Sequence, residues 1–146
     1  MPENLEFDDQ IAGLLKRTLK LEKFFPAMKP ADAAMLFPMS GLYRYAKDEY
    51  VIRQGETSKD LFIVESGTVA ITQTMGTAGA QLAALGPGEI FGEIALVRDG
   101  VRVASAVAAE ECRIFRVAYP DIQSLRSGNP ELAEHLARLA QRRSEG

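Results

Sequence analysis

The spacing of apolar positions changes twice along the chain and divides it into a helical start, a strand-rich middle and a helical end. Near the N-terminus, apolar residues recur at the intervals of an amphipathic helix, which predicts a helix over residues 8–23. Lysines and arginines gather toward its end, as the helix dipole favours. Pro30 then opens a second short helix, which Pro38 and Gly41 bring to an end. We therefore expect an N-terminal helical segment over residues 8–40, docked on its own domain or free to contact a partner.

The middle of the chain has the alternating pattern of short strands. Glycine-containing turns separate these strands, and a short helix over residues 91–97 interrupts the series. Evenly spaced short strands of this kind predict an antiparallel barrel or roll, here over residues 41–118. The expected strands, of which the fifth has the weakest pattern, are residues 42–45, 50–53, 61–64, 68–72, 81–85, 103–107 and 112–117.

The helical period returns after residue 118. We expect C-terminal helices over residues 119–143, the first ending at Gly128 and the second capped by Asn129. The apolar stripe of the second helix favours packing on the roll, although a dimer contact or a ligand contact would use the same pattern. The stripe consists of Leu132, Leu136 and Leu139.

The composition is typical of one folded domain, which we expect to span residues 1–146. The 146 residues are 47% hydrophobic and 25% charged, with a formal net charge of -3. The negative charge argues against a general nucleic-acid binder, because such proteins carry a basic surface. The single cysteine, Cys112, excludes an internal disulfide and is expected to be packed. The chain has no apolar run of membrane-spanning length and no signal peptide, so we expect it in the cytoplasm.

One segment carries far more chemistry than the rest. Gly92 and Glu93 stand at the expected start of the short helix, and Arg102 follows nine residues after the acid. Backbone N–H groups at a helix start bind phosphate oxygens, and a guanidinium can fork onto the same phosphate. A carboxylate can accept a hydrogen bond from a ribose hydroxyl. This spacing therefore predicts a site for an anionic sugar phosphate.

Further motifs surround this segment in a fixed order. They are Ile52–Glu56, Leu61–Gly67 and Gly86–Glu93, followed by the cassette itself over residues 91–105. With these motifs, the chain resembles the cyclic nucleotide-binding domains of catabolite-activator-type regulators, cAMP-dependent kinase regulatory subunits and cyclic nucleotide-gated channels. The resemblance covers residues 24–143. It implies an eight-stranded antiparallel β-roll with N-terminal helices, a short phosphate-binding helix and C-terminal helices that act as a lid.

The resemblance also implies roles for single residues. Glu93 would bind the ribose 2'-hydroxyl and Arg102 the cyclic phosphate, unless the two side chains simply pair with each other. Ile71 and Leu82 would line the sugar and base pocket, or else be ordinary core. The phosphate cradle would be completed by Gly92 and by the backbone N–H groups of Ile94, Ala95, Val103 and Ala104. The lid candidates are Leu136, Arg138, Leu139 and Arg142. The alternative for the two leucines is packing, and the alternative for Arg142 is a solvated helix end.

The residue after the cassette arginine bears on the choice of base. Family members that prefer cGMP often carry Thr or Ser there, and its hydroxyl reaches the guanine, whereas this chain has Val103. An unpaired guanine amino group in a half-buried site costs about 1–3 kcal/mol. We therefore expect cAMP as the preferred ligand, with cGMP as the weaker one.

The sequence points to a binding module rather than an enzyme. The only histidine, His135, has no nearby cysteine or acidic cluster at metal spacing, and no nucleophile–base pattern is evident. We expect no catalytic residue, metal or cofactor, no DNA-binding domain and no membrane segment. The expected partners are a cyclic nucleotide and an unknown effector protein, and the terminal helices leave a homodimer open as an alternative. The alternatives are an interaction domain of the same fold that binds no nucleotide, or a fragment of a DNA-binding regulator.

Overall fold

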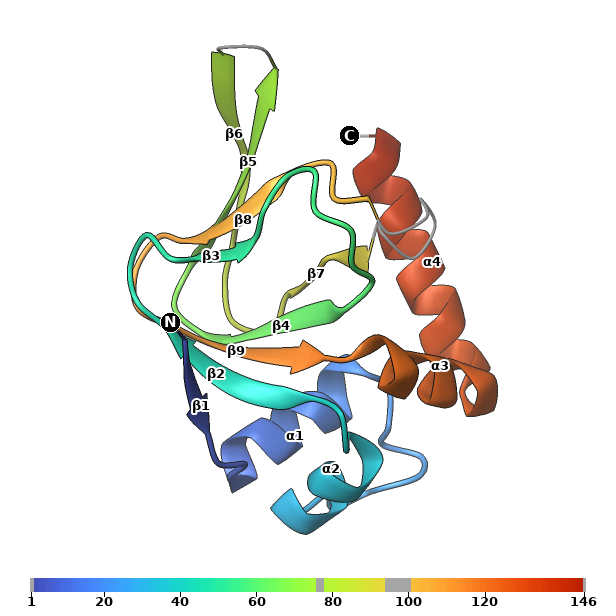
Figure 1. Ribbon diagram of the computed structural model, residues 1–146. Coiled ribbons are helices and arrows are strands. Elements are labelled where there is room, and N and C mark those ends of the chain that lie inside the picture. Colours follow the sequence, from blue (N-terminus) through green and yellow to red (C-terminus); the bar gives the residue numbers. More distant parts are fainter. Residues whose placement is uncertain (1, 76–77, 94–100, 146) are drawn as a thin grey trace.

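The chain folds into a β-roll with helices on one side (Figure 1). The computed structural model describes residues 2–75, 78–93 and 101–145. The helices are α1 (Asp9–Thr18), α2 (Pro30–Leu36), α3 (Tyr119–Gly128) and α4 (Pro130–Glu145). The described strands are β1 (Glu3–Leu5), β2 (Gly41–Tyr45), β3 (Tyr50–Ile52), β4 (Leu61–Ser66), β5 (Val69–Met75), β6 (Ala78–Leu85), β7 (Ile90–Phe91), β8 (Ser105–Ala108) and β9 (Cys112–Val117).

The described strands form two antiparallel sheets. One sheet has the order β1-β2-β9-β4-β7 and the other β3-β8-β5-β6. Strands β2 to β9 form the expected antiparallel roll, so the predicted fold class is confirmed. Strand β1 is an addition that the sequence pattern did not predict. It pairs with β2, where Arg44 and Glu3 lie opposite each other and form an ion pair.

Two apolar cores lie on opposite faces of the five-stranded sheet. Along β4, Phe62 and Val64 belong to the core between the sheets, whereas Leu61 and Ile63 belong to the core under the helices. Successive side chains of a strand point to opposite faces, so a strand buried on both faces has a continuous apolar sequence. Of the helices that contribute to the second core, α1 and α2 lie beneath the sheet in Figure 1, and α3 and α4 lie to its right.

The first helix is shorter than the sequence predicted. It ends at Thr18 rather than near residue 23, because Lys20 takes a left-handed conformation with φ 58°. The side-chain amide of Asn129 donates to the carbonyls of Leu19 (3.4 Å) and Lys20 (2.9 Å). This contact between distant parts of the chain fixes the helix end, which the apolar period of the sequence does not indicate.

The C-terminal helices pack against the helical core. Asn129 caps α4 as predicted, because its side-chain oxygen accepts a hydrogen bond from the Leu132 N–H (3.2 Å). Leu132 and Leu136 are buried in the same cluster as α1, which confirms the packing interpretation of the leucine stripe. Cys112 is also buried, and burial raises the pKa of its thiol. Among the described residues, every helix is too short or too polar to cross a membrane.

Candidate ligand-binding site

The topology brings three distant segments together at one edge of the five-stranded sheet. Strand β4 runs antiparallel to both β7 and β9, so its start lies beside their ends. Asp60 immediately precedes β4, Gly92 follows β7, and Tyr119 begins α3 just after β9. A stacked ring pair, Phe62 and Phe91, with centroids 5.2 Å apart, packs beside this junction.

Arg102 enters this junction from a fourth segment. Its side chain is only 4% exposed. Nη1 donates to the Gly92 carbonyl (2.7 Å), Nη2 to the Asp60 carbonyl (2.7 Å) and Nε to the Ser58 hydroxyl (2.9 Å). A guanidinium has five N–H donors, so two have no hydrogen-bond partner within the described residues. The predicted phosphate-binding arginine therefore lies in a buried position with two donors that no described residue accepts.

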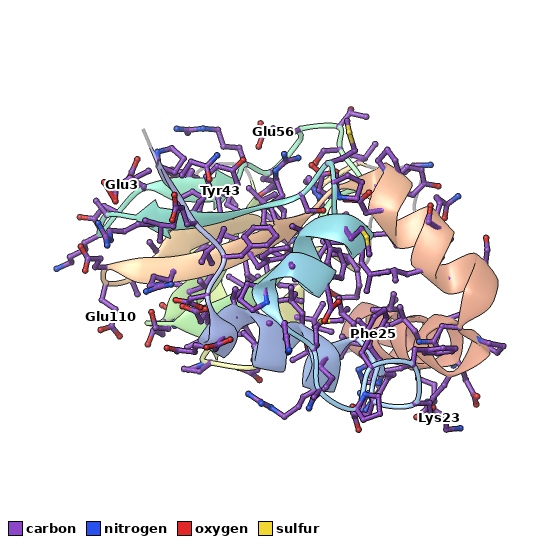
Figure 2. All side chains as sticks on the ribbon, turned by 90° about the horizontal axis from the view of Figure 1, so that it is seen from below. Glu3, Lys23, Phe25, Tyr43, Glu56 and Glu110 are labelled. Atoms are coloured by element: carbon purple, nitrogen blue, oxygen red, sulfur yellow. The ribbon has the colours of Figure 1, made fainter. Side chains whose placement is uncertain are left out.

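The backbone of Arg102 is held as firmly as its side chain. Its N–H donates to the Glu56 carbonyl and its carbonyl accepts from the Gly55 N–H, both at 2.8 Å. An isolated β-bridge between Thr57 and Val101 continues the pairing. Glu56 itself lies at the rim of the molecule (Figure 2). The loop before β4 thus positions the arginine through main-chain contacts, which do not depend on side-chain chemistry.

The electrostatics of Arg102 suit an anion. Burial lowers the pKa of its guanidinium, and the carboxylates of Asp60, Glu56 and Glu93 partly oppose that effect. All three described hydrogen-bond partners of the side chain are neutral groups, a hydroxyl and two carbonyls. A desolvated cation with neutral partners is stabilised strongly by an anion placed at its remaining donors.

Gly92 is required at its position for two reasons. Its φ is +92°, which side chains other than hydrogen rarely allow, and a Cβ there would lie 3.0 Å from the Asp60 carbonyl oxygen. The same Cβ would lie 3.1 Å from Arg102 Nη1. The glycine therefore lets its own carbonyl reach the guanidinium.

Asp60 connects the arginine to the C-terminal helices. Its backbone carbonyl binds Arg102, while its carboxylate accepts hydrogen bonds from the Tyr119 N–H (2.9 Å) and from Arg116 Nη1 (2.8 Å). The first of these caps the start of α3. The sequence analysis missed Asp60 and Ser58, because only the packing of β4 against β7 and β9 brings them to the site.

Other cassette residues are placed only in part. Glu93 is 1% exposed and directly follows Gly92. Phe91, expected to begin the short helix, instead ends β7 by pairing with Phe62. Ile94 and Ala95, predicted for the phosphate cradle, lie outside the described residues. Val103 and Ala104 are half-buried beside Arg102, and the Val103 carbonyl accepts from Gln73 Nε2 (2.9 Å).

The two predicted pocket residues differ in their surroundings. Ile71 is half-buried against the core between the sheets. Leu82 is 56% exposed, so the alternative that it is ordinary core is wrong. Strand β6 lies at the edge of its sheet and is exposed over residues 78–84, and a register shift in the β5–β6 pairing, where Ile71 faces Ala83 and Thr72 faces Gln81, leaves Leu82 as the bulge residue. Its role as a ligand contact stays a prediction.

The lid candidates on α4 fall into two groups. Leu136 is buried in the helical core and Leu139 packs partly against it. Arg138 and Arg142 are exposed, and Arg138 Nη1 lies 2.9 Å from Glu134 Oε1. In this arrangement the leucines serve packing, and the lid role of all four residues stays a prediction. The described residues hold no cluster of three or more His, Cys, Asp or Glu side chains suited to a metal.

Comparison with known proteins bears directly on this arrangement. The family model for the cyclic nucleotide-binding domain matches residues 42–129, a span that includes β4, β7, Gly92 and Arg102. The chain belongs to the cyclic nucleotide-binding domain family. The Cyclic AMP receptor protein of Thermus thermophilus is 36% identical over 118 residues, which cover 80% of this chain and 54% of the relative.

Two further comparisons agree with this family membership. The crystal structure of the Thermus thermophilus Catabolite Activator Protein matches with a TM-score of 0.69 and 33% identity, over 83% of this chain and 57% of that one. Human cGMP-dependent protein kinase 2 is 46% identical over 68 residues, which are 45% of this chain and 9% of the kinase. The chain thus spans about half the length of its Thermus relative. The cyclic nucleotide-binding domain is a regulatory domain, and the kinase shows that it also occurs within enzymes.

Proposed function

We propose that this cyclic nucleotide-binding domain is a receptor that prefers cAMP over cGMP and transmits binding to its C-terminal helices. The observation that carries the proposal is the buried Arg102 guanidinium, whose three described hydrogen-bond partners are neutral. A cyclic phosphate supplies an anion for the donors of this guanidinium that the described neutral partners do not use. Glu93, buried next to Gly92, is the acceptor for the ribose 2'-hydroxyl.

The preference for adenine rests on Val103. Its side chain has no hydroxyl, and its carbonyl already accepts a hydrogen bond from Gln73. A guanine amino group facing this side chain loses its water without gaining a protein acceptor, which costs about 1–3 kcal/mol. The likeness to cGMP-dependent protein kinase 2 over 68 residues makes cGMP the necessary comparison ligand.

The transmission of binding rests on Asp60. Its carbonyl holds Arg102 and its carboxylate holds the start of α3, so the two contacts belong to one residue. When Arg102 turns toward a phosphate, the Asp60 carbonyl loses or lengthens a charge-assisted hydrogen bond. The population of positions taken by α3 and α4 then shifts, and an effector protein that contacts these helices or α1 senses the change.

Calorimetric titration of the purified chain with cAMP and with cGMP tests the proposal. We expect cAMP to bind about tenfold more tightly than cGMP. A tenfold ratio corresponds to the lower part of the range of about 1–3 kcal/mol that one unpaired polar group costs. Equal affinities contradict the preference. If millimolar ligand of either kind leaves the melting temperature unchanged, the receptor role is wrong, because binding to the native state must stabilise it. The nucleotide-independent interaction domain is then the better interpretation.

The second candidate function is that of the ligand-binding domain of a longer regulator. The observation that favours it is the share of the Thermus relative that this chain spans, 54%. In that case the domain regulates a further segment, such as a DNA-binding one. The reading frame around the coding sequence decides between this arrangement and a receptor that acts through a separate effector protein.

A further inference from the structure

A cleft on the helical side of the molecule is lined by residues other than the hydrogen-bond partners of Arg102. It is bounded by the end of α1, the turn before β7 and the outer part of α4, and its volume is about 340 Å³. This volume falls within the range of small-molecule sites. The lining residues that matter here are Arg17, Lys20, Glu89, Ile90, His135 and Leu139.

The charged side chains that line this cleft are mostly cationic. Within the described part of the chain, neither Arg17 nor Lys20 forms an ion pair. Among the described lining residues, the carboxylate is that of Glu89, which accepts a hydrogen bond from the Gly86 N–H (2.7 Å), a neutral donor that leaves the carboxylate unpaired with a cation. The described lining therefore has two cations, Arg17 and Lys20, against one carboxylate, and neither cation forms an ion pair with it.

The two sides of the cleft are fixed relative to each other. Asn129, which caps α4, also donates to the Lys20 carbonyl at 2.9 Å, and Lys20 itself has a left-handed backbone. His135 on α4 faces this arrangement. Burial lowers the pKa of its imidazole, and Lys20 of α1 together with Arg138 and Arg142 of α4 lower it further. The cations are thus close enough to act on one another while the backbone holds them in place.

We propose that this cleft binds a small molecule that carries a phosphate group, with Arg17 and Lys20 as the principal ligands and His135 as a third donor. The guanidinium of Arg17 can fork onto two phosphate oxygens, while the ammonium of Lys20 acts as a compact charge. Ile90 and Leu139 provide apolar walls for the rest of the molecule. The site shares no residue with the surroundings of Arg102, and its occupant bridges α1 and α4.

His135 is the only histidine in the chain, so its imidazole protons give one resolved NMR reporter. Titration with inorganic phosphate is compared with sodium chloride at matched ionic strength, because salt alone screens the neighbouring cations. We expect phosphate to raise the pKa of His135 saturably, by about half a unit more than chloride does. Equal responses to phosphate and chloride would overturn the proposal.

Variants of single cations identify the ligands. We expect Lys20→Gln and Arg17→Gln each to weaken phosphate binding about threefold or more, as the loss of one partly exposed charge contact predicts. Lys23→Gln is the matched control. The Lys23 side chain is 84% exposed, lies at the rim of the molecule in Figure 2 and pairs with Glu131 at 3.8 Å. Unchanged affinity in both cleft variants, with amide spectra that show an intact fold, overturns the assignment.

Discussion

The two ends of strand β4 hold two arginines in opposite ways. At its start, Arg102 donates to a hydroxyl and two carbonyls, none of which carries a charge. Near its far end, Arg113 Nε lies 2.7 Å from the Glu65 carboxylate, and Arg113 Nη2 donates to Asp8 at 3.2 Å. Among the described residues, Arg113 thus forms ion pairs with two carboxylates, whereas the hydrogen-bond partners of Arg102 are all neutral. The charge of the direct hydrogen-bond partners, more than burial alone, distinguishes the proposed phosphate-binding arginine from the ion-paired one.

The largest expected effect is the loss of ligand binding in Arg102→Leu. The variant removes the guanidinium that donates two hydrogen bonds to the phosphate. Two charge-assisted hydrogen bonds of about 1.5–3 kcal/mol each correspond to a loss of at least about a hundredfold in cAMP affinity. Calorimetry measures this loss. Arg113→Leu is the matched control, in which we expect cAMP affinity within about threefold of the parent.

The same pair of variants has a second readout in stability. Arg113→Leu leaves the Glu65 carboxylate, 1% exposed, without its cation, and breaking such a buried pair costs about 3 kcal/mol. Arg102→Leu leaves two carbonyls without a donor and also lowers the free energy of unfolding, by about 1–3 kcal/mol. Denaturant unfolding measures both costs. If Arg113→Leu impairs cAMP binding as severely as Arg102→Leu, the contrast between the two ends of β4 is wrong.

A smaller effect is expected from a single methyl group at the Arg102 end. Gly92→Ala places a Cβ 3.0 Å from the Asp60 carbonyl oxygen in a left-handed conformation, so it should cost about 2 kcal/mol or more. Gly88→Ala is a close control, because its φ is +87° but a Cβ there meets no atom within 4 Å. We expect about 1 kcal/mol for the control. If denaturant unfolding shows that both variants lose the same free energy of unfolding, then backbone strain, and not the contact with the arginine, explains why glycine is needed at position 92.

Much of the fold follows from local patterns, whereas the surroundings of the site do not. The alternation of apolar residues indicated the strands of the roll, and the cassette spacing indicated Arg102 and Glu93. Lys20 shows the limit, since its left-handed turn depends on an amide from residue 129. Asp60 and Ser58 are ordinary polar residues before a strand. Only the antiparallel pairing of β4 with β7 and β9 turns them into partners of the arginine.

The smallest expected effect is a change of stability with pH that comes from Glu65, at the other end of β4. Within the described residues, neither Glu65 oxygen accepts a hydrogen bond, although Arg113 Nε lies 2.7 Å from the carboxylate. Burial raises the pKa of Glu65; Arg113 lowers it and Asp8 raises it further. The folded-state pKa of Glu65 therefore lies above the unfolded value of about 4.5, so the native state holds the Glu65 proton more tightly than the unfolded chain does. The contribution of Glu65 to stability is present below that pKa and is lost as pH rises through the folded pKa.

Glu65→Gln isolates this contribution, since glutamine has nearly the same shape and no charge to titrate. The free energy of unfolding of the parent, minus that of the variant, should decrease as the pH is raised from about 4.5 toward neutrality. Glu110→Gln is the control, because Glu110 is exposed and accepts a hydrogen bond from the Thr68 hydroxyl instead of an arginine. A difference that instead grows with pH means that attraction to Arg113 outweighs burial at Glu65. The carboxylate end of β4 would then be a stabilising ion pair, and the contrast with Arg102 would lie in stability as well as in binding.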